Sequence, residues 1–303
     1  MQILKTIAVV LVSVFSLSMT PVHEHQNCHG FLPENDMNIP VEDSFGQMGR
    51  NQKAGGLTEQ EFNQVISNVE RLYKDQIKSL GGNLVIKRLW DSGKVNAVAE
   101  REGDDWVVSM FGGLARVSKM TPDGFAMVVC HELGHHIGGA KKLSVVHRWA
   151  TNEGGADYFA STKCIRKYFE LDSNNQEQLK GEPLELIAVE ACKNQFNNDA
   201  DRLICARSML AGKSLAHVLK GMDWFGIGFG PDPKFSTPDS TKVMWTNDRH
   251  PNAQCRLDTY FNGSLCTMGK DSSLSDTDYR VGTCTALTHK AGLRPRCWFK
   301  PQE

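Results

Sequence analysis

The sequence has no excess of charge of either sign. Its 34 lysines and arginines nearly balance its 35 aspartates and glutamates, the formal net charge is −1, and no block of like charge stands out. A basic nucleic-acid-binding surface is therefore not indicated. Internal repeats and low-complexity tracts are also missing, and 40% hydrophobic with 23% charged residues is an ordinary globular composition. The 303 residues allow one large domain or two small ones, at about 100–200 residues each.

Long apolar runs are missing as well. The run Ile7–Leu17, broken only by Ser13 and Ser16, is too short to span a bilayer, which needs about 20 residues. It follows a short segment that carries Lys5, and small residues come after it. This layout is typical of a secretory signal peptide. We therefore expect residues 1–20 to be removed, the protein to be secreted or periplasmic, and no stable membrane insertion after cleavage.

Cysteine is abundant, since nine residues are more than a cytosolic protein usually carries. In an oxidising compartment most of them should pair, although spacing alone does not fix the connectivity. Three local bridges are plausible: Cys192 with Cys205, Cys255 with Cys266, and Cys284 with Cys297. The odd count leaves at least one thiol, and we expect it to be Cys130 because this residue lies within a predicted core helix.

The chain divides into an N-terminal extension and a single domain. Residues 21–57 are polar and rich in proline, glycine, histidine and asparagine, so we interpret them as an extension or linker with little regular structure. The domain covers residues 58–303, and its C-terminal part, about residues 250–303, is rich in cysteine. A capping box at Thr58 and Glu61 begins its first helix, which Gly81 and Gly82 end.

Periodicity predicts the remaining elements. Strands are expected at residues 83–90, 95–99 and 106–111. Helices are expected at residues 122–137 and 144–170 and over most of residues 172–220, whereas the chain beyond Gly221 is expected to be irregular. The pattern predicts an α+β fold with a small antiparallel sheet packed on helices.

The residues that carry chemistry lie in the segment Cys130–His136, which contains the pattern H-E-x-x-H inside a predicted helix. A spacing of four places His131 and His135 one turn apart on one helix face, where both imidazoles can bind one zinc ion. Glu132 lies about 100° around the helix, beside the metal, where it can take a proton from a bound water.

A catalytic zinc site needs a third protein ligand and one open position. One class of zinc proteases has a third histidine six residues after the second, but that position is Lys141 here. A second class uses a glutamate of the next helix, followed four residues later by an aspartate, and Glu153 and Asp157 fit this pattern. Glu153 would be the third metal ligand. Asp157 would accept a hydrogen bond from the far nitrogen of His131 and fix its orientation.

Together these motifs resemble the M48 family of gluzincin metallopeptidases, from about Lys94 to Arg256. The similar segments are Asn96–Ala99, Trp106–Leu114, Cys130–His136, Glu153–Asp157, and His250 with Pro251 and Arg256. The chain differs from many family members because it lacks their transmembrane helices and because its C-terminus is rich in cysteine.

The resemblance implies a zincin-like fold and a zinc-dependent metalloendopeptidase with one zinc ion per chain, acting on a peptide or protein substrate. Glu132 would be the general base, and His250 is our candidate for a side chain that helps to stabilise the oxyanion. The strand that contains Trp106, Val107, Val108, Ser109 and Met110 would be the edge along which an extended substrate lies.

Two other functions stay open at this point. A hydrolase of non-peptide amides could use the same zinc helix. A non-catalytic, zinc-stabilised binding module is the other alternative, although a structural zinc site needs no base such as Glu132.

Overall fold

The computed structural model describes residues 26–27, 30–41, 56–143, 148–172, 185–222, 228 and 230–301. The predicted signal peptide and one of the nine cysteines, Cys28, lie outside these described residues. The strands are β1 (Gln26–Asn27), β2 (Asn83–Leu89), β3 (Ala97–Glu102) and β4 (Asp105–Phe111). The helices are α2 (Glu59–Ser79), α3 (Gly112–Ala115), α4 (Pro122–Ile137), α5 (Glu153–Phe159), the π-helix η1 (Ala160–Cys164), α6 (Ile165–Glu170), α8 (Leu186–Gln195), α9 (Asp199–Lys220) and α10 (Ala253–Ser264).

The fold is α+β, as expected, but the small sheet is mixed and not purely antiparallel. The strand order is β1-β3-β4-β2, and β2 pairs with β4 in parallel, whereas β1–β3 and β3–β4 are antiparallel. A tight turn at Gly103, which has a φ of 60°, reverses the chain between β3 and β4. β4 lies between β3 and β2, and it runs parallel to β2 because β3 runs in the opposite direction to both. The apolar pattern of each strand does not encode this order.

The prediction that β4 is an edge strand is also wrong. β4 lies between β3 and β2, and all seven of its residues are paired to β2. Its five central residues, the predicted substrate edge, are buried: Trp106, Val107, Val108, Ser109 and Met110. A strand buried on both faces has a nearly continuous apolar sequence, as this one does, so the run indicates an interior strand.

The helices agree with the sequence where a cap and a clear period occur together. α2 begins at the predicted capping box, in which Thr58 Oγ1 accepts from the Glu61 amide at 3.2 Å and Glu61 Oε2 accepts from the Thr58 amide at 2.8 Å. α4 has the expected bounds. Within the helix expected over residues 144–170, the described residues 148–152 are not helical, and α5 begins at Glu153 after the cap Asn152. α10 lies in the region that was expected to be irregular.

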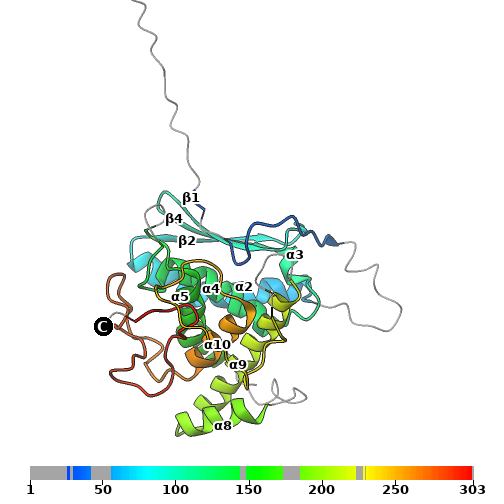
Figure 1. Cartoon of the computed structure of the whole chain (residues 1–303). Coiled ribbons are helices and arrows are strands. Elements are labelled where there is room, and N and C mark those ends of the chain that lie inside the picture. The colour runs from blue at the N-terminus through cyan, green and yellow to red at the C-terminus, as the bar shows by residue number, and fades with distance from the viewer. Residues whose placement is uncertain are drawn as a thin grey trace, which may run out of the picture.

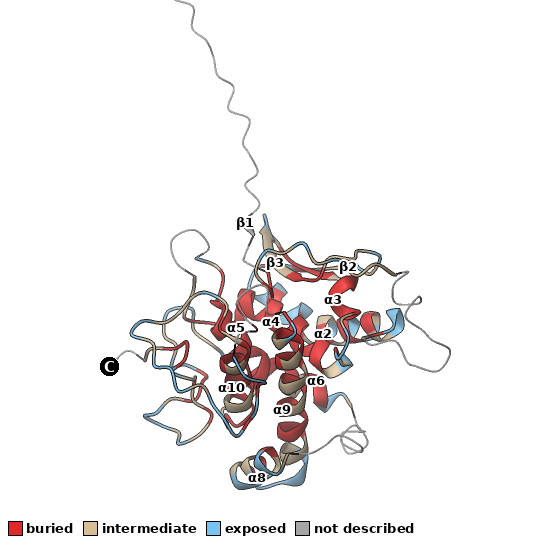
Figure 2. Cartoon of the chain, turned by 45° about the vertical axis from the view of Figure 1, so that its right-hand side comes forward, coloured by how far each residue is buried: buried red, intermediate tan, exposed pale blue. Residues whose placement is uncertain are grey.

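The sheet forms a layer above the helices, with α2 and α4 beneath it, and α9 and α10 lie farther from the sheet (Figure 1). The central helices are the most deeply buried, whereas α8 is exposed at the far end (Figure 2). The main core joins the two layers: Phe62 and Val69 of α2, Val108 of β4, and Phe125 and Leu133 of α4 are all in it. No helix in the described part of the chain is long and apolar enough to cross a membrane.

Eight of the nine cysteines form four disulfides. The pair Cys192–Cys205 was expected. The expected pairs Cys255–Cys266 and Cys284–Cys297 are wrong, because these four cysteines pair as Cys255–Cys297 and Cys266–Cys284. The fourth disulfide is Cys130–Cys164. The expectation of a free Cys130 is therefore wrong, because α4 packs against η1, which brings Cys164 to the same buried position. Four disulfides are consistent with an oxidising compartment.

Candidate metal centre

Helix α4 carries the central residues of the site. Thr121 caps it by accepting a hydrogen bond from the Gly124 amide at 3.0 Å, and Pro122 occupies its first position. Every residue from Gly124 to Ile137 is buried. Gly134 allows α5 to approach closely, because a Cβ there would lie 2.9 Å from the Ala156 backbone. The two helices that carry the predicted metal ligands are therefore in direct contact.

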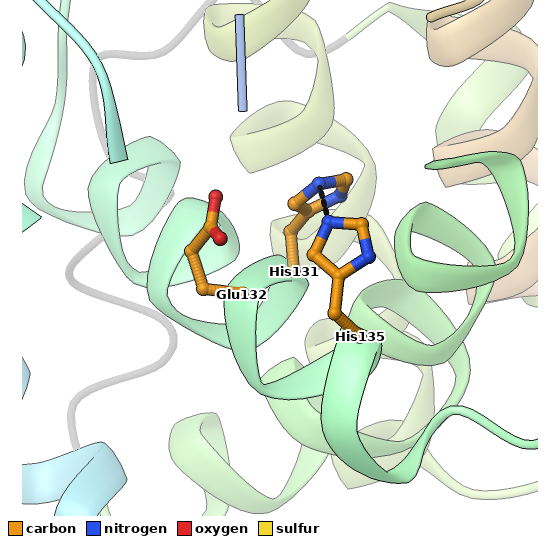
Figure 3. A group of neighbouring side chains, drawn as sticks. All are labelled: His131, Glu132 and His135. Carbon is orange, nitrogen blue, oxygen red and sulfur yellow. Dashed lines mark hydrogen bonds between the residues drawn. The ribbon is translucent and has the colours of Figure 1, made fainter. Parts of the chain in front are cut away.

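The site residues predicted on these two helices lie together. The Nε2 atoms of His131 and His135 are 3.1 Å apart, and Glu153 Oε2 and Oε1 lie 3.3 and 3.7 Å from them, respectively. Figure 3 shows that His131, Glu132 and His135 all project from α4, with the two imidazoles in contact and the Glu132 carboxylate beside them. Possible ligand atoms of these three residues lie within 4.8 Å of one another.

The outer nitrogens of the two imidazoles are both engaged. His131 Nδ1 lies 2.8 Å from Asp157 Oδ1, and His135 Nδ1 lies 2.7 Å from the Thr151 carbonyl oxygen. A carbonyl and a carboxylate can only accept, so both Nδ1 atoms donate. In the neutral imidazoles, the two Nε2 atoms then carry lone pairs that face each other and the Glu153 carboxylate. When both imidazoles are neutral, three electron-rich groups therefore converge, and this arrangement favours a cation between them.

The buried carboxylates give a second reason to expect a cation. Both oxygens of Glu132 and both oxygens of Glu153 are buried without a hydrogen-bond partner among the described residues. Buried polar atoms are normally hydrogen-bonded, so such orphans indicate an ion or a ligand. The residues present thus fit a metal ion, and the donor set of two imidazoles and a carboxylate is one that divalent transition metals accept.

The charges in the site shift its pKa values in opposite directions. Burial raises the pKa of Glu132 to about 8, although His131 opposes this shift. Burial lowers the pKa of His135 to about 4. For His131, burial favours the neutral form, but Asp157 and Glu153 outweigh it and raise the pKa to about 9. Glu153 keeps a low pKa despite its burial, because three histidines surround it. The electrostatics around His131 and Glu153 therefore favour a positive charge between them.

Asp157 accepts the hydrogen bond from His131 that the sequence predicted, and α10 holds this carboxylate in place. Arg256 Nε donates to Asp157 Oδ2 at 2.8 Å, and Arg256 Nη2 donates to Oδ1 at 2.7 Å. The Tyr260 hydroxyl donates to the same Oδ1 at 2.8 Å. Burial raises the pKa of Asp157, but Arg256 and His131 outweigh it and lower the pKa below its usual value. Arg256 and Tyr260 lie one helical turn apart, and the role of Tyr260 was missed because α10 was not predicted.

His250 also lies at the site. Its Nε2 is 3.6 Å from Glu153 Oε2 and hydrogen-bonds to the carbonyl oxygen of Gly30 at 2.7 Å. Burial lowers its pKa. The strand Trp106–Met110 contributes differently from what was expected. Its Val107 carbonyl lies 3.1 Å from Nε2 of His136, and Trp106 stacks on the same imidazole, so these residues support α4 from behind.

No protein-family model, curated protein or solved structure matches the chain.

Proposed function

We propose that the chain is a zinc-dependent metalloendopeptidase of the gluzincin type, with a zincin-like fold, that acts outside the cytoplasm in a secreted or periplasmic location. The observation that carries this proposal is the convergence of two imidazole Nε2 atoms and the Glu153 carboxylate, next to the buried and partnerless carboxylate of Glu132. Two histidines and one glutamate leave a fourth coordination position open, which is typical of a catalytic zinc site.

One zinc ion held by His131, His135 and Glu153 would polarise a peptide carbonyl and lower the pKa of a water molecule. Glu132 takes the proton of the attacking water and delivers it to the nitrogen of the leaving amine. The Glu132 carboxylate suits this role because it is fully buried beside the metal position, and neither of its oxygens has another hydrogen-bond partner among the described residues. His250 donates a hydrogen bond to the carbonyl oxygen as negative charge develops there.

Asp157, Arg256 and Tyr260 do not touch the substrate carbonyl in this proposal. They fix the orientation of His131, because Asp157 is held by three donated hydrogen bonds from Arg256 and Tyr260. A fixed imidazole keeps its Nε2 lone pair directed at the metal position. These three are positioning residues.

The test compares Glu132→Gln with wild type and with Glu190→Gln, which changes an exposed carboxylate on α8. We expect one zinc per chain in all three proteins by metal analysis. Cleavage of a casein or peptide mixture should fall by about 10²–10⁴-fold in Glu132→Gln only, since this is the usual contribution of a general base. A chelator should abolish cleavage by the other two proteins.

The same experiment separates the alternatives. A wild-type protein without stoichiometric zinc, or a Glu132→Gln variant that cleaves peptides normally, contradicts the proposal. Bound zinc with no hydrolysis of any substrate would favour the non-catalytic binding module. Cleavage of small amides but not of peptides would favour a hydrolase of non-peptide amides.

A further inference from the structure

A segment of the N-terminal extension lies beside the first residue of β3 and the residues just before this strand, while β1 pairs with the other end of the same edge. The Phe31 amide donates to the Ala97 carbonyl at 2.8 Å, the Val95 amide donates to the Met37 carbonyl at 3.2 Å, and the Ile39 amide donates to the Gly93 carbonyl at 2.7 Å. We call residues 30–39 the edge segment. Its bridge between Asn38 and Lys94 is antiparallel, as is the pairing of β1 with the other end of β3. This arrangement is the one that a sheet edge adopts with an extended peptide ligand.

The backbone of the edge segment is held by side chains of the metal centre. His250 Nε2 donates to the Gly30 carbonyl at 2.7 Å, and Arg256 Nη1 donates to the Phe31 carbonyl at 3.0 Å. His250 also lies 3.6 Å from the Glu153 carboxylate, and Arg256 holds Asp157. The carbonyls of Gly30 and Phe31 are thus bound by His250 and Arg256. His250 also lies near Glu153, a predicted metal ligand, and Arg256 also binds Asp157, which orients His131.

The next residue is bound just as specifically. The side-chain amide of Asn96 accepts from the Leu32 amide at 2.9 Å and donates to the Leu32 carbonyl at 3.1 Å. A side chain that pairs with both backbone groups of one residue recognises an extended chain whatever its sequence. The main chain of residues 30–32 is therefore recognised by three separate side chains: His250, Arg256 and Asn96.

The side chains of the edge segment define what each position accepts. Phe31 is fully buried, with its ring edge-to-face against His131 at 5.2 Å and the Arg256 guanidinium over it at 4.2 Å. Leu32 is fully buried in the main core. Position 30 has no space for a side chain, because a Cβ there would lie 2.5 Å from the Ala97 carbonyl oxygen. The order of preferences is a glycine, then an aromatic residue, then an aliphatic residue.

We propose that the edge of β3 beside the metal centre is a peptide-binding groove for an extended chain of the type glycine–aromatic–aliphatic, and that residues 30–32 of the edge segment occupy it in the intact chain. The inference rests on the proposed function, because it names the substrate class of the same site. It also explains the closed centre: His131, Glu132 and His135 are fully buried, and Phe31 is packed directly on His131. A substrate competes with the edge segment for this groove, so the intact chain cleaves peptides, but more slowly than a chain with an empty groove would.

The test measures binding in zinc-loaded full-length Glu132→Gln protein, in which a bound peptide is not cut. The probe is a fluorescent peptide with the sequence of residues 26–34 and the change Cys28→Ser. Adding Gly30→Ala to the protein places a Cβ against the Ala97 carbonyl and should expel the edge segment. The matched control is Gly269→Ala, where an added Cβ meets only Ser272 Oγ, at 3.2 Å.

We expect the Gly30→Ala protein to bind the peptide about tenfold more tightly, since a tethered competitor has an effective concentration near the millimolar range. The control should bind as the parent does, and Phe31→Ser in the peptide should weaken binding about tenfold or more.

A second measurement, amide hydrogen exchange, does not need the Gly30→Ala variant and therefore tests the inference even if that variant does not fold. In the Glu132→Gln protein, an excess of the peptide should speed exchange at the amides of Phe31 and Leu32. It should not change exchange at Leu57, whose amide is bonded to the Ala115 carbonyl away from the groove. The inference is overturned if the peptide neither binds nor speeds this exchange, or if the Phe31→Ser peptide binds equally well. If the peptide fails these tests but zinc-loaded wild type still cleaves other peptides, only the groove is contradicted and the proposed function is retained. If wild type neither binds zinc nor cleaves any peptide, both the groove and the proposed function are contradicted.

Discussion

The region around the candidate metal centre and the C-terminal region from residue 265 to residue 301 are stabilised in different ways. The first consists of helices α4, α5 and α10, and its buried charges neutralise one another. The described residues of the second contain no helix or strand, yet Trp298 and Phe299 in it are buried. The disulfide Cys255–Cys297 links it to α10, and the disulfide Cys266–Cys284 lies within it. The two regions meet where the Trp298 ring covers Gly154 of α5, so close that a Cβ on Gly154 would lie 2.2 Å from it. The irregular region is therefore part of what positions Glu153.

The largest effect should come from removing that contact. Trp298 is fully buried, and its indole N–H donates to Thr259 Oγ1 at 3.0 Å. We expect Trp298→Ala to lower the free energy of unfolding by about 3–5 kcal/mol and to weaken metal binding, because a cavity opens behind α5. Trp245→Ala is the control, since Trp245 is 73% exposed and should change stability by less than about 0.5 kcal/mol. Denaturant unfolding and zinc titration measure both. Unchanged metal affinity in a destabilised Trp298→Ala protein would show that the two regions are independent.

The disulfides test the same connection with a smaller expected effect. Replacing both cysteines of Cys255–Cys297 by serine should cost about 2–5 kcal/mol of stability. The two cysteines of Cys255–Cys297 are 42 residues apart in the sequence, whereas those of Cys192–Cys205 are 13 apart. In the chain-entropy model, losing the first disulfide should therefore lower the free energy of unfolding by about 1 kcal/mol more than losing the second. Only the first double variant should also weaken metal binding, because Cys255 precedes Arg256 on α10. Equal effects of the two double variants on zinc affinity would contradict this assignment.

A carboxyl group on α10 should make stability depend on pH. Burial raises the pKa of Asp258 to about 6, even though the Asp239 amide and the Gln254 side chain donate to it. The unfolded pKa is about 3.9, so the folded state favours the protonated form, and this contribution is lost as the pH rises through about 6. We expect the stability of Asp258→Asn relative to wild type to improve by about 2–3 kcal/mol between pH 4 and pH 8. Unfolding curves at both pH values measure the change, and a constant difference would mean that Asp258 does not titrate with a raised pKa.

The features that could be predicted from the sequence are those that local signals encode. In α2 and α4 the caps Thr58 and Thr121 and the helical period occur within one short window, and both helices were located correctly. The spacing of His131, His135, Glu153 and Asp157 also predicted which side chains meet. These are local signals, each encoded within one or two turns of helix.

The features that sequence reasoning missed depend on contacts between distant segments. The position of β4 in the interior of the sheet depends on β2, which precedes it by two strands. The pairing of Cys130 with Cys164 depends on how η1 packs against α4. Gly30 and Phe31 reach the metal centre across more than 200 positions of the chain, through His250 and Arg256. No local pattern marks such contacts.

Measured zinc affinities should distinguish Glu153, the proposed metal ligand, from Asp157, which orients His131. Asp157→Asn should weaken zinc binding by about 10–100-fold, because the hydrogen-bonded support of His131 is lost. Glu153→Gln should weaken it more, since a charged ligand is removed. Tyr260→Phe is the milder comparison, because it removes one of the hydrogen bonds to Asp157 and leaves both bonds from Arg256. Competition titration with a chelator measures all three variants. If Asp157→Asn abolishes binding while Glu153→Gln retains it, the two roles are reversed and Asp157 is the ligand.

The smallest effect should come from the first cap of the domain, which stabilises a helix but lies outside the site. Thr58 Oγ1 accepts from the Glu61 amide, and Glu61 Oε2 accepts from the Thr58 amide, so both bonds depend on this one pair. Thr58→Ala should lower the free energy of unfolding by about 1 kcal/mol, the typical value for losing a cap. Zinc affinity should not change, because α2 packs behind α4 and contributes no ligand. Thr58→Ser keeps the hydroxyl and should recover most of the stability. A loss of zinc affinity in Thr58→Ala would contradict this prediction, because it would show that the position of α4 and its ligands depends on the cap of α2.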